Sequence, residues 1–154
     1  MTIQTGNTNS WKTEIMQGIH APTDTYKLLL IKTGHTGVYG PATTNMGTPG
    51  SGAPSNSNLG TDEVSGPGYT SGGITLAAPS YTLNGSRARM DFADPTALTN
   101  CTFSADGAMI VNTSKGGRVL GVYLFASAPV AANGGSFTVD MPAAGDTTSL
   151  MRLE

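Results

Sequence analysis

The chain has little charge, little cysteine and few long apolar runs. Of its 154 residues, 12% are charged, 38% are hydrophobic and 6% are aromatic. The charged and hydrophobic shares are both below those of an average globular protein. Thr, Ser, Asn and Gly must therefore cover much of the surface. Such a surface is unusual for a free cytosolic enzyme, which keeps a more charged coat, and it suits a β-rich protein packed against neighbours.

The few charges are balanced and dispersed. The 8 Lys and Arg residues and the 10 Asp and Glu residues give a formal net charge of -2. A nucleic-acid-binding protein needs a basic stripe that displaces counterions from phosphates. Arg87, Arg89, Lys115 and Arg118 come nearest to such a stripe, and they are too few. We therefore expect no direct binding to nucleic acid.

Cysteine and histidine are almost absent. Cys101 is the one cysteine, so an internal disulfide bond is excluded. A zinc site needs several Cys or His residues at short spacing, and the only histidines, His20 and His35, are distant in sequence. The acidic residues also lack the spacing of a calcium loop. We predict no metal and no cofactor.

The sequence gives no indication of a targeting or membrane-spanning segment. No apolar run approaches the roughly 20 residues that a helix needs to cross a bilayer. The first five residues, Met-Thr-Ile-Gln-Thr, lack the basic start and apolar core of a signal peptide. We therefore expect synthesis in the cytoplasm, a soluble product and no membrane partner.

Catalytic motifs are lacking as well. There is no Gly-x-Ser-x-Gly elbow for a nucleophilic serine. The glycine-rich run at residues 66–73 has no Gly-Lys-Ser/Thr and leads into a strand, where a phosphate loop needs a helix. His20 and His35 occupy positions typical of surface or capping residues. We predict that the protein is not an enzyme and has no catalytic residues.

One helix is predicted, over residues 10–19. Trp11 and Ile15 begin an apolar stripe at helical spacing. Ser10 is a candidate N-cap, and Gly18 is a typical stop. A helix this short is marginal alone, so Trp11 must dock either on the sheet of its own domain, which we favour, or on a partner subunit.

Short strands and turns occupy most of the remaining sequence. The strands are predicted at residues 26–31, 74–77, 80–84, 87–93, 101–104, 108–112, 119–126, 136–141 and 149–153. Turns are expected at Asn84-Gly85 and at residues 133–135. This spacing predicts a single all-β domain over residues 1–154. We expect a β-sandwich or jelly-roll-like antiparallel domain with one short N-terminal helix and a long Gly/Ser/Thr-rich loop.

That loop, residues 33–73, is called the arm below. Its sizeable apolar residues are Val38, Tyr39, Met46, Leu59, Val64 and Tyr69. They are too few for a core of its own, and the arm is far longer than an ordinary connection. It is therefore either disordered or held down by contacts. Tyr39 and Tyr69 are large, stiff and able to hydrogen-bond, so they can anchor it.

Several segments together resemble one family of small structural proteins from the virions of tailed bacteriophages. The segments are residues 11–20, 23–30, 62–76, 88–92, 107–112, 122–125 and 135–139. They occur in the same order through nearly the whole chain, and the glycine-rich run at residues 62–76 is the most informative. Residues 44–58 depart from the family pattern because they are longer and lower in complexity.

The resemblance implies a virion structural protein that works by contact. Within that class we favour a capsid cement or decoration protein that bridges major capsid protein subunits and associates with copies of itself. The residues expected to contact partners are Tyr39, Met46, Leu59 and Tyr69 in the arm, and Trp11 if the helix docks outward. One alternative is a tail, neck or fibre-associated structural protein. Another is a host-glycan-binding module that uses Tyr39, Tyr69 and Tyr81 as platforms.

Overall fold

The computed structural model describes residues 2–142 and 150–153. Antiparallel strands dominate this part of the chain, so the predicted all-β class is confirmed. In chain order the elements are β1 (Gly6–Asn7), α1 (Asn9–Met16), β2 (Tyr26–Lys32), the 3-10 turn η1 (Gly60–Asp62), β3 (Ile74–Thr75), β4 (Ser80–Asn84), β5 (Arg87–Asp91), β6 (Leu98–Asn112), the 3-10 turn η2 (Thr113–Lys115), β7 (Arg118–Leu124), β8 (Val130–Phe137) and β9 (Met151–Leu153).

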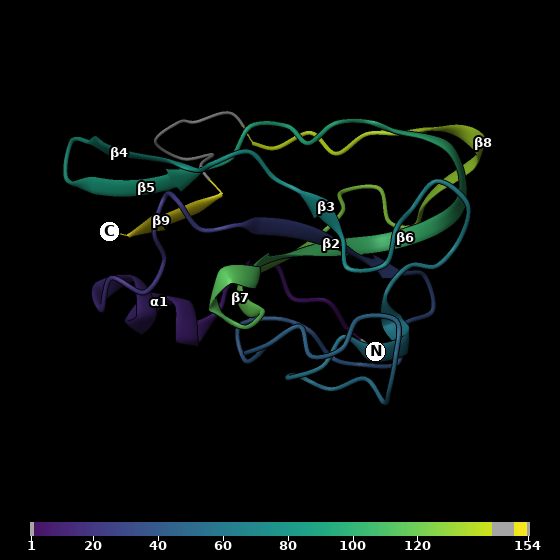
Figure 1. Ribbon diagram of the computed structural model, residues 1–154, viewed down its shortest axis with the longest axis horizontal. Coiled ribbons are helices and arrows are strands. Elements are labelled where there is room, and N and C mark those ends of the chain that lie inside the picture. The colour runs from purple at the N-terminus through teal and green to yellow at the C-terminus, as the bar shows by residue number, and fades with distance from the viewer. Residues whose placement is uncertain (1, 143–149, 154) are drawn as a thin grey trace.

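The strands form a larger and a smaller sheet (Figure 1). The larger sheet has the order β1, β7, β6, β2, β3, and β8 also pairs with β6. The smaller sheet has the order β4, β5, β9. Every pair of named strands is antiparallel. Strand β6 is the spine of the larger sheet, because β2, β7 and β8 all pair with it.

Strand β6 runs without a break where the sequence predicted two strands joined through residues 105–107. That prediction was wrong because the ladder continues across the junction, where Gly107 pairs with both Ile31 and Leu124. A Cβ at Gly107 would lie 2.3 Å from the carbonyl oxygen of Tyr123. The glycine therefore permits a close strand approach and does not mark a turn.

Strand β8 also corrects a prediction. Residues 133–135 were expected to turn the chain, but they lie inside this strand. The register passes from Asn133 to Gly135 opposite consecutive residues of β6, which makes Gly134 an extra residue with a φ of 72°. Such a bulge needs a left-handed conformation that glycine adopts readily. The strand then ends at Phe137, earlier than predicted.

The predicted helix exists, but its start differs from the prediction. Helix α1 is shorter than expected and is capped by Thr8, whose hydroxyl accepts a 3.2 Å hydrogen bond from the Trp11 amide, so the predicted cap at Ser10 was wrong. Two other local predictions agree with the structure. The stop at Gly18 is correct, with a left-handed φ of 69°. Strand β4 has its predicted bounds, and Gly85 completes the predicted hairpin with a φ of 59°.

Each face of the larger sheet has its own core. The first core joins one face of this sheet to the smaller sheet and to α1, with Leu28, Leu30, Ile110, Met90, Phe92, Met151 and Trp11 among its members. The second core joins the opposite face to the arm, with Leu29, Ile31, Met109, Val111, Tyr39 and Leu59 among its members. Both faces of β2 are thus covered, which explains its continuous apolar run.

The first part of the arm, residues 33–62, covers the second face. Figure 1 shows these residues gathered beneath β2, β6 and β7, on the side of these strands away from β4 and β5. The remainder of the arm returns to β3, and its Val64 and Tyr69 side chains belong to the first core. Main-chain hydrogen bonds of 2.8 Å from Leu59 to Met46 and from Met46 to Gly117 tie the arm to the loop before β7, and one of 3.0 Å from Val64 to Leu30 ties it to β2. The arm has little core of its own, as predicted, and completes the core of the sheet.

Candidate functional site

The structure places the predicted contact residues mainly inside the protein. Trp11, Tyr39, Leu59 and Tyr69 are buried in the two cores, and Met46 packs partly buried against the second core. In a polar segment with few apolar side chains, burying each of them is favourable. The favoured prediction for Trp11, docking on the sheet of its own domain, is confirmed. For the arm residues Tyr39, Leu59 and Tyr69 the prediction of partner contact is corrected: in this conformation they attach the arm to its own domain. The predicted anchoring roles of Tyr39 and Tyr69 are confirmed.

Asp62 clamps the first part of the arm. Its Oδ2 accepts hydrogen bonds from the backbone amides of Thr36 at 2.9 Å and Gly37 at 2.6 Å, and from the Tyr39 hydroxyl at 2.8 Å. Burial acts to raise the pKa of Asp62, but these hydrogen bonds and the charge of Lys32, 3.8 Å away, outweigh it and leave the pKa lowered. The carboxylate therefore stays ionised and holds the loop that precedes Tyr39.

Glu63 clamps the second part of the arm. Its Oε1 accepts hydrogen bonds from the Tyr69 hydroxyl at 2.8 Å and from the Gly72 amide at 2.7 Å, and its Oε2 accepts one from Ser71. The Tyr69 hydroxyl also accepts a 3.2 Å hydrogen bond from the amide of Leu30 in β2. Burial, together with the adjacent Glu63 charge, raises the pKa of Tyr69. This chain of hydrogen bonds ties the glycine-rich run to the larger sheet.

The two clamps leave an exposed arm surface without ionised carboxylates or amines. Asp62 and Glu63 are the only Asp, Glu, Lys or Arg residues within residues 33–73, and both are buried. The arm's other ionisable side chains, those of His35, Tyr39 and Tyr69, are buried as well. The exposed arm residues are mostly Gly, Ser, Thr, Asn and Pro, together with Val38, Ala42 and Ala53. The arm is therefore a fixed, mostly polar and uncharged face, which can be desolvated against a partner without burying a charge.

A buried polar network lies at the opposite end of the larger sheet, beneath α1. His20 Nε2 lies 2.9 Å from Glu14 Oε2, and His20 Nδ1 lies 3.0 Å from the Asn112 side-chain amide. Glu14 also pairs with Arg118, and the Asn112 amide donates a 2.8 Å hydrogen bond to Asp24. The His20 side chain is wholly buried. The network can fix α1 to β6 and β7, but it cannot meet a substrate in this conformation.

Both histidines differ from their predicted positions at the surface. His20 joins that network, and the buried His35 lies 3.0 Å from the Gly37 carbonyl through Nδ1. Sequence reasoning missed the network because its members are far apart in the chain. One signal was present: Glu14 is three residues from Trp11, so both lie on the face of α1 that turns inward.

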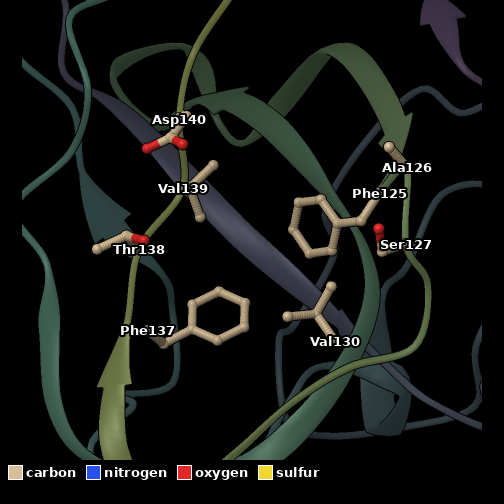
Figure 2. A pocket seen from close by; sticks show the side chains of 8 residues that line it. All are labelled: Phe125, Ala126, Ser127, Val130, Phe137, Thr138, Val139 and Asp140. Carbon is tan, nitrogen blue, oxygen red and sulfur yellow. The ribbon is translucent and has the colours of Figure 1, made fainter.

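An apolar pocket lies between the loop that joins β7 to β8 and the segment that follows β8. Figure 2 shows Phe125, Val130, Phe137 and Val139 around it, with Asp140 at one edge. Its volume is about 230 Å³, and a neighbouring pocket of about 340 Å³ shares Phe125 and Val139 with it. The lining has space for an apolar side chain and brings no nucleophile together with a base.

The described residues lack the features of several other classes of site. No group of three or more His, Cys, Asp or Glu side chains there could hold a metal ion. None of the helices in that part of the chain has the length and apolar character required to cross a membrane. Of the three tyrosines predicted as glycan platforms, Tyr39 and Tyr69 are buried and only Tyr81 is exposed, so that prediction fails for the first two.

Comparisons with known proteins add no family assignment. No protein-family model, curated protein or solved structure matches the chain.

Proposed function

We propose that the protein is a bacteriophage virion structural protein, and within that class a capsid cement or decoration protein with a β-sandwich or jelly-roll-like domain. It would bridge major capsid protein subunits on the particle and would act by contact, without catalysis. The sequence resemblance over residues 11–139 motivates this assignment. The low charge of the whole chain supports it, because much of the surface of a cement protein is in contact with neighbouring subunits.

The observation that carries the proposal is the uncharged outer face of the arm. A surface loop this long without function would ordinarily carry Lys, Glu or Asp side chains that favour solubility. Here the two acids of the arm, Asp62 and Glu63, turn inward and stiffen it. A stiff loop loses little conformational entropy when it docks, and an uncharged one loses little hydration energy.

Placing charges on this face tests the proposal. Ser51 and Asn56 are exposed arm residues, so the pair can be changed to lysine in one variant and to glutamate in another. Burying an unpaired charge of either sign is costly. We therefore expect both variants to lose co-sedimentation with phage particles prepared without this chain. Lysines at the exposed Gln17 and Thr96, outside the arm, are the matched control and should leave co-sedimentation unchanged.

The result separates the arm from other candidate surfaces. Equal loss in the arm variants and the control would indicate a general charge effect and would contradict the assignment of this face. Full binding by both arm variants would also contradict it. Circular dichroism and the melting temperature of each variant establish that the domain is still folded.

A further inference from the structure

Strand β4 has one edge that pairs with no described strand and that is complementary to itself. We propose that β4 pairs antiparallel with β4 of a second copy, about a two-fold axis beside Thr82, so that the two smaller sheets become one continuous sheet. Within the part of the chain that the structure describes, β4 pairs only with β5, on one side. This inference does not rest on the proposed virion role.

The hairpin register determines which main-chain groups point outward. Asn84 pairs with Arg87 across a two-residue turn, and such a closing pair is hydrogen-bonded. Hydrogen-bonded and non-hydrogen-bonded pairs alternate, so Thr82 directs its amide and carbonyl toward β5. Tyr81 and Leu83 direct theirs to the free edge, where no main-chain hydrogen bond joins them to another described residue.

One register uses all of these outward groups. With the axis at Thr82, Tyr81 of each copy lies opposite Leu83 of the other, and each of these two pairs exchanges two main-chain hydrogen bonds. The two Thr82 residues then form the central, non-hydrogen-bonded pair. Tyr81 and Leu83 are the two residues whose main-chain groups point outward. With the axis at either of them, only one of the two would form main-chain hydrogen bonds with β4 of the other copy.

The side chains favour a second copy as the occupant. Tyr81 and Leu83 are 39% and 74% exposed. In this register the Tyr81 side chain of each copy packs against the Leu83 side chain of the other copy. No residue of β4 is charged, so two copies meet without repulsion. The strand also has neither the lysine nor the proline that commonly protects an exposed edge. Its contact area is small, so the pairing in solution should be weak and should strengthen where copies are held side by side.

Disulfide trapping tests the register. Thr82→Cys places two thiols in the central pair, where the Cβ atoms of facing residues lie about 4.5–5.5 Å apart. Ser80→Cys is the matched control, because Ser80 is exposed on the same strand but lies opposite residue 84. We expect Thr82→Cys to form a disulfide-linked dimer about tenfold faster than Ser80→Cys under mild oxidation. The native Cys101 is wholly buried, so the wild-type protein should form none.

Charge pairing supplies an independent readout. Thr82→Lys and Thr82→Glu should each abolish self-association, because like charges face each other across the axis, and an equimolar mixture should restore it. Sedimentation velocity up to about 1 mM protein measures all three samples and the wild type, a range that reaches weak dimers. Equal trapping rates for the two cysteine variants, a monomeric wild type throughout this range, or no recovery in the mixture would overturn the proposal.

Discussion

The Tyr39 hydroxyl donates a 2.8 Å hydrogen bond to Asp62 Oδ2, and neither side chain is exposed to solvent. The aromatic ring belongs to the second core, while the hydroxyl reaches the carboxylate that also holds the Thr36 and Gly37 amides. One residue thus joins the apolar and the polar attachments of the arm. The arm behaves as part of the folded domain for this reason, although almost none of it is regular secondary structure.

Replacing Tyr39 with phenylalanine should therefore destabilise the protein. The ring remains, but a buried ionised acceptor loses one donor, which costs about 1–3 kcal/mol. Urea unfolding measures the change. Tyr81→Phe is the matched control, because the partly buried Tyr81 hydroxyl donates to the neutral carbonyl of His20 and to no ionised group, so its loss should cost less. Equal losses in the two variants would contradict the clamp.

Acid should weaken the Asp62 clamp. The folded-state pKa of Asp62 lies below its ordinary value of 3.8, so its stabilising contribution is present above that value and is lost as the pH falls through the folded-state pKa. For the wild type, we expect the urea concentration at the unfolding midpoint to decrease as the pH is lowered below about 4. Asp62→Asn should be less stable at pH 7 and should show a shallower acid dependence. Some dependence should remain, because the pKa of Asp24 is also lowered: burial opposes the shift, but hydrogen bonds from Ala21 and Asn112 outweigh it. Parallel pH profiles for the wild type and the variant would refute this role.

Two adjacent glycines offer a matched test of how the arm meets β2. Gly72 and Gly73 have φ values of 92° and 88°, so alanine is strained at both positions. A Cβ at Gly73 would lie 2.6 Å from the Leu28 carbonyl oxygen, whereas a Cβ at Gly72 would meet nothing within 4 Å. Gly73→Ala should therefore cost about 1–3 kcal/mol more than Gly72→Ala in urea unfolding. Similar losses would show that the close contact with β2 is absent.

The tip of the arm should be removable without unfolding the domain. Residues 47–58 begin and end side by side, because the Leu59 amide donates a 2.8 Å hydrogen bond to the Met46 carbonyl, and the tip is mostly exposed. Replacing them with two glycines should leave one cooperative unfolding transition and the near-native circular dichroism. The same variant should bind phage particles less well. Undiminished particle binding would exclude the tip from the contact surface.

Local patterns in the sequence predicted much of the fold. The β4–β5 hairpin and the helix stop at Gly18 follow from turn chemistry that a few neighbouring residues determine. The errors occurred where distant partners decide the structure. The glycines at 107 and 134 resemble turn residues in the sequence, but one allows a close strand approach and the other forms a bulge within paired strands.

The arm shows the same limit at the level of the site. Its polar composition correctly indicated a segment that needs support from elsewhere, and Tyr39 and Tyr69 were correctly predicted as anchors. The role of the two acids could not be predicted, because Asp62 and Glu63 are recognisable as inward clamps only when their donors from residues 36, 37, 39, 69 and 72 are brought together. For the same reason, apolar arm residues looked like partner contacts when the larger sheet is what covers them.

The most direct test of the proposed virion role is quantitative mass spectrometry of purified particles of a phage whose genome carries this sequence, if the proposed phage origin holds. We expect the protein to be present in copy numbers comparable to those of the major capsid protein. A few copies per particle would indicate a tail or neck component and would contradict the cement role. Absence of the protein from the particles would contradict the whole assignment.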